Sequence, residues 1–116
     1  MILIFNIYLY YLLNIYYLYY SKIPRNVEDY QVMICDPMLA TGGSVCMAIK
    51  ELKARGIKEE NILFINIVSC PEGIHRVMKE YPHIKIVTAA YDEGLNDQRY
   101  IVPGLGDYGD RYFNTV

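Results

Sequence analysis

The first 21 residues of this 116-residue chain contain no charged side chain, although charged residues make up 21% of the whole. All acidic and basic residues lie between Lys22 and Arg111, and together they leave a formal net charge of −2. Proteins that bind nucleic acid usually carry a clustered excess of Lys and Arg. The slightly acidic balance therefore argues against a nucleic-acid-binding function.

Cysteine is also scarce. Cys35, Cys46 and Cys70 are odd in number, lie far apart and form no Cys-x-x-Cys pair. Disulfide frameworks and zinc sites need paired or closely spaced cysteines. The pattern favours a reduced, cytoplasmic protein, and the length predicts one domain, since domains typically hold about 100 to 150 residues.

Residues 1–18 are uncharged and rich in Tyr, Leu and Ile, and three interpretations of them stay open. About 20 residues suffice for a membrane-spanning helix, but Tyr and Asn are scattered through the segment rather than confined to its ends. The charged start and small-residue end of a signal peptide are missing. Ile, Asn, Tyr, Leu and Phe can all be encoded by A and T alone, so we favour translated noncoding sequence over a membrane-like segment. The third interpretation is a genuine buried element.

From Tyr30 onward, strand and helix patterns alternate. Apolar runs predict strands over residues 31–36, 62–68 and 85–90, with a fourth at 100–102. The second run is apolar on both faces, which is typical of a parallel strand covered on both sides. Between the strands, helical periodicity predicts one helix that begins near Ser44 and ends before Gly56, and another from Pro71 to Pro82.

This order predicts an α/β fold, half of a doubly wound parallel sheet. Ligands of such sheets bind at the carboxyl ends of the strands. The loop after the first of these strands runs Asp36-Pro-Met-Leu-Ala-Thr-Gly-Gly-Ser44. Its two glycines allow backbone N–H groups to point outward at a helix N-terminus, which suits a phosphate group. No Gly-Lys-Ser/Thr is present, so a nucleoside-triphosphate loop is disfavoured, and a simple turn and helix cap stays the alternative.

The strand, the acid and the Thr-Gly-Gly-Ser together resemble the phosphoribosyl diphosphate (PRPP) motif of type I phosphoribosyltransferases. The form with Pro37 after the acid is similar to that of the uracil phosphoribosyltransferases. Two further segments resemble the same family: Ser69-Cys-Pro-Glu-Gly-Ile74 and Tyr100-Ile-Val-Pro-Gly-Leu-Gly-Asp-Tyr-Gly-Asp-Arg111. Even Tyr19-Tyr-Ser-Lys-Ile-Pro24 resembles the stretch that precedes the strand.

The resemblance implies two sets of binding residues and no catalytic or metal-ligating side chain. It assigns PRPP binding to Asp36, Pro37, Met38, Leu39, Ala40, Thr41, Gly42, Gly43, Ser44 and Asp107. It assigns uracil binding to Ile101, Gly106, Asp107 and Tyr108. The reaction implied is uracil plus PRPP giving UMP and diphosphate, in pyrimidine salvage.

Residues 91–116 carry five acids and two bases, so PRPP is expected to bind together with Mg²⁺, which offsets the repulsion between negative charges. GTP is a candidate allosteric effector by resemblance.

The resemblance spans residues 19–116, which correspond to the second half of a family member. We therefore expect a Rossmann-like phosphoribosyltransferase fold that is incomplete on its N-terminal side, with residues 1–18 as a separate segment. A complete protein of this kind is expected to form a homodimer or higher oligomer. The alternative function is a catalytically inactive truncated homologue that at most binds a phosphorylated ribose, tethered to a membrane if residues 1–18 act as an anchor.

Four other features of the sequence invite functional interpretations that we disfavour. Gly104-Leu-Gly-Asp-Tyr-Gly109 satisfies a dinucleotide-binding pattern, but too few residues follow it for the required helix, so we interpret it as a loop. Asp110 is expected to be a local partner of Arg111. His75 and His83 are predicted to be surface residues, and Glu72 a first-turn acid favoured by its helix dipole.

Overall fold

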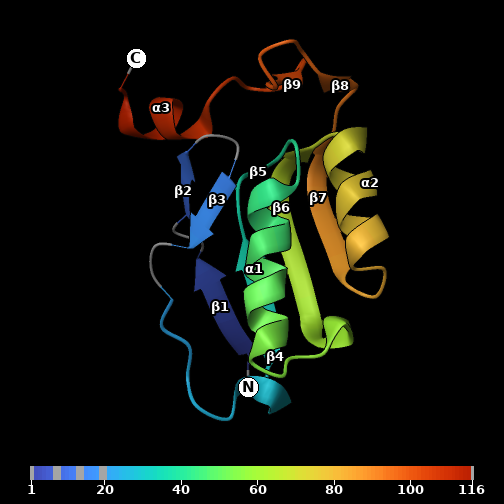
Figure 1. The fold of residues 1–116 in the computed structure, drawn as a ribbon. Coiled ribbons are helices and arrows are strands. Elements are labelled where there is room, and N and C mark those ends of the chain that lie inside the picture. Colours follow the sequence, from blue (N-terminus) through green and yellow to red (C-terminus); the bar gives the residue numbers. More distant parts are fainter. Residues whose placement is uncertain (1, 7–8, 13–14, 19–20, 116) are drawn as a thin grey trace.

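The computed structural model describes residues 2–6, 9–12, 15–18 and 21–115, and for those before residue 21 only the backbone path (Figure 1). Its main sheet is parallel throughout. The central strand is β6 (Ile62–Ser69), flanked on one side by β7 (Lys85–Tyr91). On the other side it pairs first with β4 (Gln31–Cys35) and, nearer its carboxyl end, with β5 (Met38–Leu39). The predicted α/β class with a parallel sheet is confirmed.

The N-terminal segment supplies three short strands. β1 (Ile2–Asn6) adds to the sheet in parallel beside β4. β2 (Leu9–Leu12) and β3 (Ile15–Leu18) pair with each other in antiparallel fashion and form a separate ribbon. The origin of residues 1–18 stays a prediction, because backbone pairing does not distinguish among the three interpretations.

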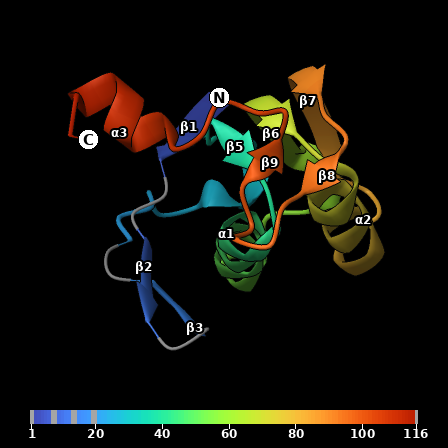
Figure 2. The same ribbon diagram turned by 90° about the horizontal axis from the view of Figure 1, so that it is seen from above.

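Two helices cover one face of the main sheet. α1 (Gly43–Ala54) and α2 (Pro71–Glu80) follow β5 and β6, and both lie on the same side of the strands when the sheet is viewed end-on (Figure 2). Each is close to its predicted bounds: α1 starts where the Gly-Gly pair ends, and Gly56 follows it with a φ of 91°. The core lies between these layers, and Ile34, Phe64, Ile49 and Leu52 are all fully buried in it.

The opposite face of the sheet has no helix over it within the described residues, so the prediction that both faces of β6 are buried is wrong. Ile62 and Phe64 face the helices and are buried, whereas Ile67 on the other face is 44% exposed. Val87 on β7 is 53% exposed. Apolar side chains therefore line a sheet surface that remains open to solvent.

The predicted fourth strand forms, but it does not join the main sheet. Ile101–Val102 is instead β9, which pairs in antiparallel fashion with β8 (Gly94–Leu95) in a separate small sheet beyond the carboxyl end of β7. Three-residue strand signals such as 100–102 carry no information about their partner, so sequence alone could not assign the sheet. No helix of the described part is long and apolar enough to cross a membrane.

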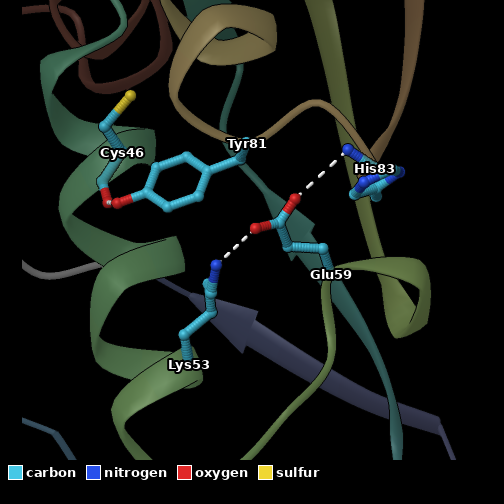
Figure 3. Close-up of polar contacts among 5 residues, drawn as sticks. All are labelled: Cys46, Lys53, Glu59, Tyr81 and His83. Carbon is cyan, nitrogen blue, oxygen red and sulfur yellow. Dashed lines mark hydrogen bonds and ion pairs between the residues drawn. The ribbon is translucent and has the colours of Figure 1, made fainter.

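A cluster of polar contacts joins α1 to the connections around η2 (Glu59–Asn61) and the end of α2 (Figure 3). Lys53 Nζ forms an ion pair with Glu59 and lies 5.3 Å from the ring centre of Tyr81. The backbone N–H of His83 donates to Glu59 Oε2 at 3.2 Å. Tyr81 Oη donates to the carbonyl oxygen of Cys46 at 3.4 Å. This Lys53 cluster holds α1 at two points, at Cys46 near its start and at Lys53 near its end.

Candidate functional site

A pocket of about 450 Å³ opens where β4 and β5 end and α1 begins. This is the edge of the sheet at which parallel α/β proteins bind their ligands. The residues that line it are Asp36, Met38, Leu39, Ala40, Thr41, Gly42, Gly43, Ser44, Val45, Gln98, Arg99 and Asp107. All the residues predicted to bind PRPP therefore line this pocket except Pro37.

The loop that forms the pocket is ordered by short-range contacts. The carboxylate of Asp36 accepts a hydrogen bond from the backbone N–H of Met38 at 3.2 Å. Gly42, at the N-cap of α1, adopts a φ of 79°, a conformation that L-residues with a β-carbon rarely adopt. The first N–H groups of α1 have no partner within the helix and lie where its dipole is positive. The loop can therefore hold an anion such as a phosphate group.

The start of α2 packs against the underside of this loop. Cys70 N–H donates to the carbonyl oxygen of Leu39 at 3.3 Å, and Cys70 Sγ lies 3.3 Å from that of Ala40. Arg76 Nη1 donates to the carbonyl oxygen of Thr41 at 3.5 Å. Burial raises the pKa of the Cys70 thiol, so Cys70 supports the loop as a neutral thiol.

Three charged groups line the pocket. Burial raises the pKa of the half-buried Asp36 carboxyl above its ordinary value, and the N–H of Met38 partly opposes that shift. Asp107 and Arg99 are both exposed. They reach the pocket from the segment after β7, whereas the Gly-Gly loop precedes α1. Among the described residues, Arg99 is the one basic side chain in the lining.

Arg99 and Gln98 are pocket residues that the sequence analysis missed. They belong to a tight turn in which Asn96 Oδ1 accepts hydrogen bonds from the N–H groups of Gln98 and Tyr100, at 3.0 and 2.9 Å. Arg99 itself adopts a φ of 65°. A non-glycine residue in this conformation often marks a functional constraint, but no sequence pattern around residue 99 indicates it. The pair Asn96-Asp97 is the one sequence signal of this turn, and it does not point to the pocket.

Of the residues predicted to contact uracil, Asp107 alone among the described residues lines the pocket itself. Ile101 belongs to β9 and is buried in a small cluster against which the pocket residues Met38 and Ala40 pack. Gly106 is exposed with a φ of 77°. Tyr108 begins a helix, α3 (Tyr108–Phe113). The interpretation of residues 104–109 as a loop is therefore wrong at its end.

Asp107 caps this short helix, and the cap explains why α3 forms so close to the C-terminus. Its Oδ1 accepts a hydrogen bond from Asp110 N–H at 2.8 Å, which is the preferred role of Asp at an N-cap. The prediction that Asp110 pairs with Arg111 is wrong, because Asp110 Oδ1 accepts a hydrogen bond from Thr115 Oγ1 at 2.6 Å.

The other candidate side chains have the modest roles expected of them. His75 and His83 are both exposed, as predicted. Glu72 lies in the first turn of α2, and hydrogen bonds from backbone N–H groups, its own first, lower its pKa. One of these donors is Leu95 N–H, at 3.2 Å, so Glu72 also joins α2 to β8.

Comparison with known proteins places the chain beside one enzyme family. The sequence model of that family, described as uracil phosphoribosyltransferase, matches residues 14–115. The uracil phosphoribosyltransferase of Dictyostelium discoideum is 52% identical over 84% of this chain and 45% of its own length. That of Lactococcus lactis is 53% identical over 84% of this chain and 46% of its own length.

A solved structure agrees with these sequence matches. The AQ2163 protein of Aquifex aeolicus superposes with a TM-score of 0.75 at 39% identity, and covers 84% of this chain and 46% of its own. The chain thus spans about half the length of the relatives it matches. The matched region includes the whole pocket described above, and the chain belongs to the uracil phosphoribosyltransferase family.

Proposed function

We propose that this chain supplies the PRPP-binding part of a uracil phosphoribosyltransferase, which converts uracil and PRPP to UMP and diphosphate in pyrimidine salvage. The observation that carries the proposal is the pocket that Asp36 and residues 38–45 form together with Gln98, Arg99 and Asp107. It combines an anion-binding loop, a carboxylate and a cation, which are the groups that a phosphorylated sugar diphosphate requires.

Each part of PRPP finds chemically matched groups in this pocket. The 5-phosphate suits the backbone N–H groups at the start of α1, with the hydroxyls of Thr41 and Ser44 as further donors. The ribose hydroxyls suit the carboxylate of Asp36, which lies at the end of β4 beside that loop. The diphosphate suits Arg99, because a guanidinium binds phosphate oxygens through paired hydrogen bonds.

In the reaction, N1 of uracil bonds to C1 of the ribose as the bond from C1 to the diphosphate oxygen breaks, and the N1–H proton passes to the released diphosphate or to solvent. Positive charge develops on the ribose and negative charge on the leaving diphosphate. The protein's contribution is to position both substrates and to stabilise the departing charge. The residues of the pocket bind and orient PRPP, and Arg99 lies where it can balance part of the leaving group's charge.

Mg²⁺ enters this proposal as part of the substrate complex, where it neutralises phosphate charge. Asp36 and Asp107 offer the oxygen donors that Mg²⁺ prefers. The described residues contain no cluster of three or more His, Cys, Asp or Glu side chains that could hold a metal ion. The donor set therefore fits an ion held mainly by diphosphate oxygens and water.

Recognition of uracil is proposed to rest on the backbone around Gly106 and Tyr108, next to Asp107. Backbone N–H and C=O groups match the donors and acceptors on the edge of an uncharged pyrimidine. GTP is retained as a candidate effector on family grounds alone, and it is tested by adding it to the assay below.

The deciding experiment incubates the purified chain with uracil, PRPP and Mg²⁺ and measures UMP by chromatography. Formation of UMP supports the enzyme function. Its absence from a chain with a folded far-UV spectrum would overturn that function for this polypeptide. Calorimetric titration with PRPP then tests the alternative, in which the chain only binds the phosphorylated sugar.

A single substitution tests the phosphate-binding role of the loop. Gly43→Val places a branched side chain in the lining, and we expect PRPP binding to be lost. Gly56→Asn is the matched control, because it changes a glycine at the far end of the same helix to a residue that tolerates a positive φ. Unchanged affinity in Gly43→Val would refute the assignment of the loop.

A further inference from the structure

Asp92 is a half-buried acid that comes directly after β7 and does not itself line the pocket. Its backbone N–H donates to the carbonyl oxygen of Ser69, the last residue of β6, at 2.8 Å. Its carboxylate Oδ2 accepts a hydrogen bond from the backbone N–H of Gly104, also at 2.8 Å. Asp92 therefore connects the carboxyl end of the main sheet to the segment that joins β9 to α3 (Figure 1).

Gly104 lies in a tight turn beyond the last residue pair of the β8–β9 ladder. Its φ is 54°, and a β-carbon at this position would overlap the carbonyl oxygen of Ile101. Hydrogen bonds from an N–H group to a carboxylate are shorter and stronger than those to a neutral acceptor, and 2.8 Å is within their usual range. The carboxylate of Asp92 therefore fixes the position at which the chain leaves this turn.

Apolar contacts hold the next residue of this segment. Leu105 packs against a small buried cluster of apolar side chains, and the pocket residues Met38 and Ala40 pack against the same cluster. Its buried members are Val68, Cys70 and Ile101. The bond to Asp92 and this cluster together hold residues 104–105 close to the loop of residues 36–44.

The two residues that follow reach the pocket. Gly106 is exposed, and no described atom lies within 4 Å of the place that a β-carbon would take, so its backbone groups are accessible. Asp107 lines the pocket, and its Oδ1 caps α3 by accepting the hydrogen bond from Asp110 N–H. The segment is thus anchored at both ends, at Gly104 by Asp92 and at Asp107 by the helix cap, with accessible backbone between the two anchors.

We propose that Asp92 is a positioning residue for the base: through its bond to Gly104 it places the backbone of Gly106 and Tyr108 against the uracil ring. The proposal rests on the proposed function, because it takes this segment to be the one that recognises uracil. Hydrogen bonds weaken steeply as their geometry departs from the ideal, so recognition by backbone groups requires a fixed backbone. The phosphorylated ribose is assigned to the loop of residues 36–44, and its binding should not depend on Asp92.

The first test measures amide hydrogen exchange by NMR in the ligand-free chain. Asp92→Ala removes the acceptor, and we expect the N–H of Gly104 to exchange about tenfold faster. Asp92→Asn keeps an oxygen acceptor and should restore most of the protection. The N–H of Asn96 donates to the carbonyl oxygen of Tyr100 at 2.9 Å in the same hairpin, and its exchange should not change. Unchanged exchange at Gly104, or equal acceleration at Asn96, would overturn the proposal.

The second test compares UMP with ribose 5-phosphate by calorimetry, since UMP carries the uracil ring in addition to the phosphorylated sugar. The ratio of the two affinities reports on the base alone. Asp92→Ala should lower this ratio by about tenfold, the equivalent of one hydrogen bond, and leave the affinity for ribose 5-phosphate unchanged. Asp92→Asn should recover most of the ratio. Glu93→Ala removes the exposed acid next in the chain; it is the matched control and should change neither affinity.

The two ligands also separate positioning of the base from general support of the fold. If Asp92→Ala weakens both ligands by the same factor, or leaves the ratio unchanged, Asp92 does not position the base and the proposal is overturned. If the wild type binds neither ligand, the proposed function fails. If it binds both equally, the uracil contacts of Gly106 and Tyr108 fail. In these last two cases the role toward the base falls as well, while hydrogen exchange at Gly104 still decides whether Asp92 holds the segment.

Discussion

The backbone of Gly73 lies against the carbonyl oxygen of Ala40, so closely that a β-carbon on residue 73 would come within 2.6 Å of that oxygen. The same β-carbon would lie 2.8 Å from Leu39 Cγ. Contacts this short leave no room for any side chain. The first turn of α2 and the loop of residues 36–44 are therefore packed as one unit, and Gly73 in the Pro-Glu-Gly of 71–73 is explained by that contact.

Gly73→Ala should destabilise the chain by about 1 to 3 kcal/mol, the usual cost of forcing one extra carbon into a packed site. Because the contact is with backbone, the loop itself must move, and PRPP affinity should fall as well. Urea unfolding and calorimetry measure the two effects. In the control Gly109→Ala, the nearest atom to the new carbon is the carboxylate Oδ1 of Asp107 at 3.2 Å, so a change below about 0.5 kcal/mol is expected. Equal effects in both variants would contradict this explanation.

Arg99→Gly should separate binding from stability. Relief of the positive φ contributes about 1 kcal/mol, and the greater freedom of glycine in the unfolded chain costs a similar amount. Stability should therefore change little, whereas loss of the cation should weaken PRPP binding by roughly tenfold. Arg99→Lys keeps the charge and should retain part of the affinity. A variant Arg99→Gly that binds PRPP normally would remove Arg99 from the proposed site.

Asp107 has two roles that two substitutions can distinguish. Asp107→Ala removes the helix cap and should cost about 1 kcal/mol locally, seen as a loss of helical chemical shifts over residues 108–113. Asp107→Asn keeps a good cap but removes the charge. It should preserve α3 and weaken only the Mg²⁺-dependent part of PRPP binding. If both variants keep that dependence intact, Asp107 acts only as a cap.

Glu59→Gln tests the Lys53 cluster. The hydrogen bond from Lys53 lowers the pKa of Glu59 below its ordinary value of 4.5. The ion pair therefore stabilises the fold above about pH 4.5, and this contribution is lost as the pH falls through the folded-state pKa. At pH 7 the variant should be less stable by no more than about 1 kcal/mol, since the pair is near the surface.

The difference between Glu59→Gln and the wild type should vanish once the pH lies below the folded-state pKa of Glu59, because Glu59 is then protonated in both states. Glu80→Gln is the control, as it breaks the exposed Arg76–Glu80 pair at 3.1 Å and should have a smaller effect. A difference that persists undiminished at low pH would assign the effect to packing rather than to charge.

Much of the fold follows from local pattern. Apolar side chains recur with the period of their element, as Val32 and Ile34 do in β4 and as Ile49 and Leu52 do in α1. Gly56 marks the end of a helix. Such signals depend only on neighbours in the chain. What covers the second face of a strand is set by segments far away in the sequence. Ile67 was therefore predicted to be buried, but it is exposed. The same reason explains β9: its partner β8 is a two-residue strand with no pattern of its own.

The candidate site, too, is partly predictable from local sequence and partly not. The loop from Asp36 to Ser44 forms a continuous motif, and the sequence predicts it almost completely. Arg99 enters the pocket through a turn more than 50 residues away. No spacing in the sequence connects Arg99 to Asp36, because only the folded chain brings them together.

The uncovered face of the sheet also determines how the chain should respond to denaturant. Both the heat-capacity change and the urea m-value of unfolding scale with the surface newly exposed when the structure opens. Ile67 and Val87 are already in contact with water in the native state, so they add little to either quantity. For its length, this chain should unfold along an unusually shallow urea transition, and its stability curve should be broad and flat with temperature.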